Sequence, residues 1–115
     1  MARKVALKAS EAFMARKKGI FSNTVVTVDK NGNASMFLFG NRIAFHTADN
    51  RIFVTTAGWD TNTTRSRLNE VVGIRVSNRS NTLTLNGHEW DGRWAEVVHA
   101  DPVTMVNKSE PPIID

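Results

Sequence analysis

Residues 57–69, AGWDTNTTRSRLN, join a β-patterned part of the chain to a helix and so decide how the fold is organised. Gly58 lets the chain leave a strand tightly, and Trp59 can anchor the corner. The next four residues, 60–63, are all good helix N-cap residues. This stretch therefore predicts a strand-to-helix corner, followed by a short helix that Gly73 can end.

Upstream of the corner, residues 24–56 have the period-two pattern of β-strands, and turn signals such as Asn31-Gly32 interrupt it. The pattern predicts an antiparallel meander of four strands, at 24–28, 36–39, 42–46 and 51–56. Residues 36–39 are apolar on both faces, so we expect both to be covered. Strict alternation places His46 on the exposed face of its strand, opposite Ile43 and Phe45.

The first residues predict a second helix, over 2–18. Apolar side chains recur there at helical spacing, at Val5, Ala9, Ala12 and Phe13. The basic run 16–18 precedes Gly19, as is typical of a helix C-terminus with a C′ glycine.

The part of the chain after the corner predicts a β-hairpin from 74–77 and 82–85 and a last strand at 94–98. Residues 101–115 contain all three prolines and few aromatic residues, which favours a loosely ordered tail. The expected fold is therefore α+β, with one domain at 1–100: an N-terminal helix, a β-meander, one short internal helix and a second β-hairpin region.

The composition of the 115 residues limits the possible functions. There is no cysteine, which excludes disulfides, thiolate metal sites and cysteine nucleophiles. Apolar runs are too short to span a membrane, and no secretory signal is visible. We therefore expect a cytoplasmic protein, with no membrane partner and no cofactor.

The net charge of +4 comes from one end of the chain. Residues 1–18 carry six basic side chains and one acidic one, a net charge of +5, and the other 97 residues sum to −1. This cluster either complements the end of a helix or forms an arm that contacts nucleic-acid phosphates. The candidate phosphate contacts are Arg3, Lys4, Lys8, Arg16, Lys17 and Lys18.

Two further cations, Arg65 and Arg67, lie in the first turns of the corner helix, where the helix dipole disfavours positive charge. Together with free N–H groups at the helix start, they could form a second anion site. The alternative is that Asp60 and Glu70 neutralise them and fix the corner.

The stretch LNGHEWDGRW, residues 85–94, contains a third set of candidates. Trp90 and Trp94 suit core or rim positions, or, with Arg93, a partner-binding patch. Nearby acids and histidines could bind a metal only if the fold gathers them; these residues are His88, Glu89, Asp91 and His99. No spacing supports a catalytic set, so we expect no enzyme and no metal ligands.

Three segments together show a resemblance to known proteins. FGNRIA at 39–44 precedes AGWDT at 57–61 and TTRSRLN at 63–69, and this order resembles a family of small uncharacterised tailed-bacteriophage proteins. The later LNGHEWDGRW at 85–94 also looks like phage sequence of this type. That family has a GN-x-I-A strand followed by an AGW-x-T-x-TTR-x-RLN segment. The resemblance implies a phage origin and no particular activity.

The leading hypothesis from these observations is a non-enzymatic phage protein that binds nucleic acid through the basic helix and the two corner arginines. An alternative is an early phage protein that binds and inhibits a host protein, such as a defence or transcription component, through its tryptophan and Phe/Arg patches and not through the basic helix. A third is a metal-dependent hydrolase.

Overall fold

The computed structural model describes residues 2–71, 73–97 and 103–105. The first half contains α1 (Ala2–Ala15), β1 (Gly19–Phe21), β2 (Thr24–Val28), β3 (Ala34–Leu38), β4 (Asn41–His46) and β5 (Ile52–Val54). The second half contains α2 (Asn62–Asn69), β6 (Val76–Arg79), β7 (Thr82–Leu85), β8 (His88–Glu89), β9 (Ala95–Val97) and β10 (Val103–Met105). An antiparallel sheet has the order β1-β2-β3-β4-β5-β9-β10, and a smaller one has the order β6-β7-β8. The expected α+β class is confirmed, with more strand than helix.

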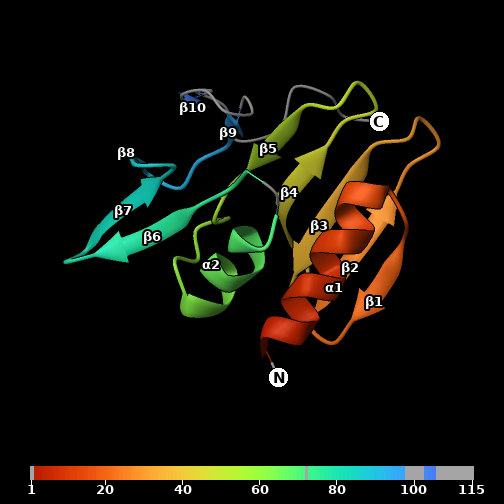
Figure 1. Cartoon of the computed structure of the whole chain (residues 1–115), viewed down its shortest axis with the longest axis horizontal. Helices are drawn as coiled ribbons and strands as arrows, with labels where there is room; N and C mark the ends of the chain where they lie inside the picture. Colours follow the sequence, from red (N-terminus) through yellow and green to blue (C-terminus); the bar gives the residue numbers. More distant parts are fainter. Residues whose placement is uncertain (1, 72, 98–102, 106–115) are drawn as a thin grey trace.

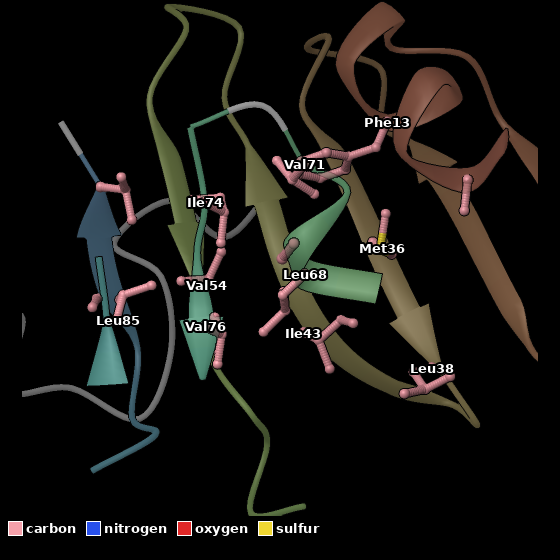
Figure 2. Packing of buried hydrophobic residues seen from close by; sticks show 14 of the residues in the cluster. Phe13, Met36, Leu38, Ile43, Val54, Leu68, Val71, Ile74, Val76 and Leu85 are labelled. Carbon is pink, nitrogen blue, oxygen red and sulfur yellow. The ribbon is translucent and has the colours of Figure 1, made fainter. Parts of the chain in front are cut away.

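The core lies between one face of the large sheet and the two helices (Figure 1). Side chains from α1, the α2 segment and β6 fill the space over β3, β4 and β5, as Figure 2 shows. Phe13, Met36 and Leu68 are among the largest fully buried side chains. Burying such residues contributes about 1.5–3 kcal/mol each relative to full exposure. In the described part of the chain, no helix is long and apolar enough to cross a membrane.

Helix α1 ends at Ala15, three residues earlier than expected. Arg16 has a positive φ of 56°, and its N–H donates to Phe13 O while that of Lys17 donates to Ala12 O at 2.8 Å. This pair of bonds is a Schellman cap with arginine at C′. Gly19 therefore begins β1, a strand that the sequence pattern did not predict.

The meander of β2 to β5 is confirmed, but the position of His46 was wrong. The register skips Ile43, because Met36 pairs with Ala44 and Phe37 with Arg42. Such a bulge breaks the alternation of side chains. His46 consequently faces the core, 1% exposed. Its Nδ1 lies 3.3 Å from the backbone oxygen of Phe13 at the end of α1.

Strand β9 lies beside β5 although forty residues lie between them in the chain, and one ion pair lies beside this contact. Arg51 donates to both carboxylate oxygens of Glu96, from Nε and Nη2, each at 2.9 Å. Strand β10 then adds to the edge at β9, so residues 103–105 belong to the sheet and not to a loose tail. The other residues of the expected tail lie outside the described part of the chain.

This ion pair predicts how stability depends on pH. The hydrogen bonds from Arg51 hold the pKa of Glu96 below its ordinary value of 4.5. A carboxyl whose pKa is lowered by folding stabilises the protein above its unfolded pKa, and this contribution is lost as pH falls through the folded pKa. Glu96→Gln should therefore lower the free energy of unfolding by about 0.5–1 kcal/mol at pH 7 and by less at acidic pH.

Urea unfolding at neutral and acidic pH measures this difference. Glu89→Gln is the matched control, because Glu89 is exposed and forms no ion pair with any described residue. An equal loss for Glu96→Gln at both pH values would contradict the prediction.

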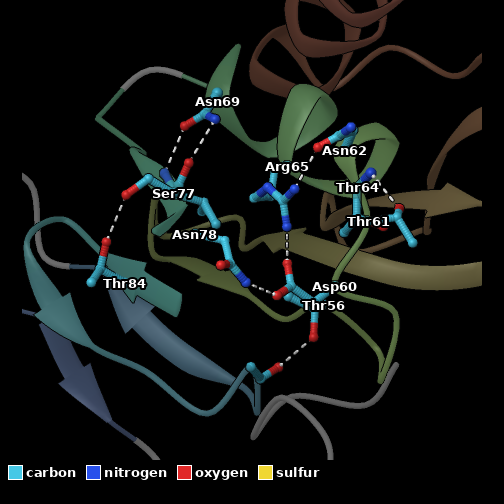
Figure 3. A network of polar contacts seen from close by, with 12 residues as sticks. Thr56, Asp60, Thr61, Asn62, Thr64, Arg65, Asn69, Ser77, Asn78 and Thr84 are labelled. Atoms are coloured by element: carbon cyan, nitrogen blue, oxygen red, sulfur yellow. Dashed lines mark hydrogen bonds and ion pairs between the residues drawn. The ribbon is translucent and has the colours of Figure 1, made fainter. Parts of the chain in front are cut away.

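Helix α2 begins as the sequence predicts, with Thr61 as its N-cap: the Thr61 hydroxyl accepts from Thr64 N at 3.1 Å. The helix stops at Asn69 with Glu70 as C-cap, so Gly73 is not its C′ residue as expected. The Asn69 side chain instead bonds both backbone groups of Val76, at 2.6 and 2.8 Å, and joins the helix end to β6 (Figure 3).

Candidate functional site

The two most exposed large aromatic side chains, Phe39 and Trp59, line the same cavity of about 480 Å³. Phe39 is 69% exposed and Trp59 is 60% exposed. Buried side chains form the deeper wall: Leu38, Ile43, Thr56 and Thr64. The remaining lining residues are polar and uncharged: Asn41, Thr61 and Thr63. We call this hollow the Phe39–Trp59 cavity; none of the described residues that line it is charged.

The backbone that presents Phe39 is strained. Phe39 and Gly40 form the two-residue turn between β3 and β4, with φ of 51° and 81°. A turn with two positive φ angles suits Asn-Gly, and the chain has that pair, Asn86-Gly87, between β7 and β8. A bulky residue in the left-handed region costs about 1–2 kcal/mol. Neither burial nor the geometry of the turn therefore favours a phenylalanine at position 39.

Trp59 also follows a strained turn. Ala57 and Gly58 have φ of 56° and 85°, and Trp59 N donates to Thr56 O at 2.9 Å. A distant residue stabilises the turn: Thr56 N donates to the backbone oxygen of Gly92 at 2.9 Å. A Cβ at Gly92 would lie 2.5 Å from the Thr56 hydroxyl, so this close approach requires glycine. Strained positions of this kind cluster at binding sites.

Phe39→Asn tests this argument through stability. Asparagine adopts the left-handed region readily, so the variant should unfold with a free energy about 1 kcal/mol higher than the natural protein. Urea unfolding gives the difference. Phe39→Ala is the control, because it removes the ring and keeps an unfavourable residue in the turn. A loss of stability in Phe39→Asn would show instead that the ring packs as part of the fold.

Both corner arginines have polar partners within the chain. Arg65 pairs with Asp60 and also donates to Asn62 (Figure 3). Arg67 is buried, and its Nε donates to Thr24 Oγ1 at 2.8 Å. The expected neutralisation by Asp60 is confirmed for Arg65. Burial lowers the pKa of Arg67, and its guanidinium joins α2 to the start of β2.

The basic N-terminal cluster contains both a side chain that is bound within the protein and side chains that are exposed. Arg16 is turned into the protein, where Nη2 donates to Thr47 O at 2.6 Å and lies 3.1 Å from His46 Nε2. The exposed cations of the cluster are Lys4, Lys8, Lys17 and Lys18. Arg3 lies in α1, and its side chain is outside the described part of the structure.

The prediction that Trp90 and Trp94 form a partner-binding patch is wrong, because both side chains are buried. Trp90 and Trp94 are 4% and 6% exposed. Trp90 belongs to the main core and donates from Nε1 to Arg93 O at 2.9 Å, and Trp94 packs with Phe45 and Phe53. The alternative core positions are therefore confirmed, and only Arg93 of the three remains exposed, beside Asp91.

The metal candidates are not gathered. In the described part of the chain no three acidic or histidine side chains are placed to hold a metal ion. His88, Glu89 and Asp91 are all exposed, and His99 lies outside the described residues.

Comparison with known proteins identifies a family. Residues 2–104 match the family model described as Kyanoviridae Gp96 protein. A search of the curated proteins and a search of the solved structures gave no significant match. The match includes both helices and the segments that resembled phage sequence.

Proposed function

The chain belongs to the Kyanoviridae Gp96 family of phage proteins, and from this premise we propose that it is a protein-binding module whose Phe39–Trp59 cavity receives an apolar side chain of a partner. The partner that best suits a phage protein of this kind is a host protein. The observation that carries the proposal is that two exposed aromatic rings line one uncharged cavity.

The chemistry of the cavity favours a protein over a nucleic acid. Tryptophan and other aromatic residues are enriched among the few interface residues that supply most of the binding energy. The buried wall of Leu38 and Ile43 offers apolar surface, and the threonine hydroxyls at the rim offer hydrogen bonds. A nucleic-acid site needs cations for phosphates, and none lines the cavity among the described residues.

Affinity purification from infected host cells tests the proposal. The natural protein and the double variant Phe39→Asn/Trp59→Ala carry the same tag, and the lysates are treated with nuclease. A stoichiometric protein that the natural chain retains and the double variant loses is the expected result. A protein that both retain, or none, would contradict a partner site at this cavity.

A second candidate function, nucleic-acid binding, is favoured by the four exposed lysines of α1 and the residues after it: Lys4, Lys8, Lys17 and Lys18. These side chains supply phosphate contacts without base recognition. The guanidinium groups of the corner arginines already have partners within the chain, Asp60 for Arg65 and Thr24 for Arg67, so this candidate does not rely on them.

This candidate predicts a strong dependence of duplex DNA binding on salt. If all four lysines contact phosphates, log K should fall with log salt concentration with a slope of about −3 to −4. Replacing the four by glutamine should abolish the slope, whereas Lys30→Gln, which lies outside this cluster, should not change it. Fluorescence anisotropy of labelled DNA over a salt series measures both. A flat salt dependence, or no binding at low salt, would remove this candidate.

A further inference from the structure

A second hollow adjoins the Phe39–Trp59 cavity across the loop 56–60. Its volume is about 730 Å³. The lining comes from this loop and from the β7–β8 region: Thr56, Gly58, Asp60, Asn81, Thr82, Leu83, Glu89, Trp90 and Asp91. Thr56 lines both hollows, and Trp59 lines the first while its neighbours Gly58 and Asp60 line the second. A ligand that fills the cavity is therefore next to the second hollow.

The second hollow is acidic. Three carboxylates line it, from Asp60, Glu89 and Asp91, and no cation does among the described residues. We call it the acidic hollow. Asp60 is held by Arg65 and by Asn78 Nδ2 (Figure 3).

The two remaining carboxylates of the acidic hollow are accessible to a ligand. Asp91 is exposed, and its contact with Arg93 is a long one of 3.4 Å between two solvated side chains. Such a pair contributes little and is easily replaced. Glu89 forms no ion pair with any described residue. The hollow thus keeps negative charge that the chain does not neutralise.

From this placement we propose that the partner presents a cationic segment: its apolar side chain fills the Phe39–Trp59 cavity, and a neighbouring lysine or arginine lies in the acidic hollow. The inference rests on the proposed protein-binding function and adds the chemistry of the partner. Complementary charge at an interface sets specificity and association rate. The chain as a whole carries a net charge of +4, and residues 1–18 supply +5 of it, so the attraction for such a segment comes from the local carboxylates of the acidic hollow and not from the charge of the whole protein.

A display library of short random peptides, selected on the full-length protein, tests the inference. Counter-selection on Trp59→Ala keeps only peptides that depend on the cavity. The enriched peptides should combine a large apolar residue with a nearby lysine or arginine and lack acidic residues. Measured singly, they should bind the double variant Glu89→Lys/Asp91→Lys about tenfold more weakly or worse. Glu89→Gln/Asp91→Asn should give an intermediate loss, and Glu11→Lys, on α1, is the matched control that should give none.

The possible failures separate the two proposals. Trp59-dependent peptides without a charge preference would overturn the cationic partner and leave the protein-binding function standing. A library with no Trp59-dependent peptide would overturn both. Helix α1 itself presents an exposed apolar residue, Leu7, between two exposed cations, Lys4 and Lys8. If the protein self-associates and Trp59→Ala abolishes the association, the occupant of the two hollows is a second copy of this chain. That result would overturn the proposal of a foreign partner.

Discussion

Arg67→Ala is expected to lower the free energy of unfolding by about 2–4 kcal/mol. Arg67 is 3% exposed, and its guanidinium donates from Nε to Thr24 Oγ1 at 2.8 Å and from Nη2 to Asn23 Oδ1 at 3.0 Å. Removing it leaves an unfilled space and the side-chain oxygens of Asn23 and Thr24 without these donors. The substitution also removes the hydrogen bonds that join α2 to the start of β2.

Two variants show whether this loss belongs to the buried guanidinium. Arg67→Lys retains a charge but cannot reproduce the planar pair of donors, so it should recover only part of the stability. Arg65→Ala removes a surface pair with Asp60 and should cost less than about 1 kcal/mol. Urea unfolding of the three variants gives the comparison. A change below 1 kcal/mol for Arg67→Ala would show that its buried contacts contribute no net stability.

Arg65 and Arg67 also show how far sequence reasoning reaches within the stretch that organises the fold. The N-cap at Thr61 and the pairing of Arg65 with Asp60 are local, so sequence spacing could predict a cap among residues 60–63 and an acidic partner for the arginines as one of two alternatives. The partners of Arg67 lie 43 and 44 residues earlier in the chain. No local pattern carries that information, because it depends on which elements pack together.

The same distinction between local and distant contacts applies to the large sheet. Period-two alternation and turn residues are sufficient to predict the four-strand meander. The bulge that omits Ile43 from the register reverses the side-chain pattern toward the end of β4, so a strict alternation places His46 on the wrong face. The contact of β9 with β5 and the addition of β10 depend on pairing between distant segments, which periodicity does not specify.

The Phe39–Trp59 cavity could be predicted only in part. The corner at Trp59 follows from Ala57-Gly58, but its ring was expected to anchor the corner and is instead exposed. Phe39 looked like the last residue of an apolar strand. The available signal was Gly40 directly after it, since a turn centred on Phe39-Gly40 puts the ring at the tip and not in the sheet.

Trp59→Ala should mainly weaken binding, and Trp90→Ala should mainly lower stability. Trp59 is mostly exposed, so its removal should change the free energy of unfolding by no more than about 0.5 kcal/mol. Trp90 is buried in the core and donates to Arg93 O, so Trp90→Ala should cost about 3–5 kcal/mol. Binding should respond in the other order: Trp59→Ala should weaken affinity for the captured partner about 30-fold or more, the loss typical of an interface hot spot.

Urea unfolding and calorimetric titration with the captured partner measure the two effects on the same preparations. A stable Trp59→Ala protein that no longer binds separates a binding role from a structural one, which a buried tryptophan cannot do. If Trp59→Ala binds as well as the natural protein, the exposed ring supplies no binding energy. The strain in the Ala57-Gly58 turn would then have only the corner itself to explain it, and the Phe39–Trp59 cavity would be a by-product of how β5 turns into α2.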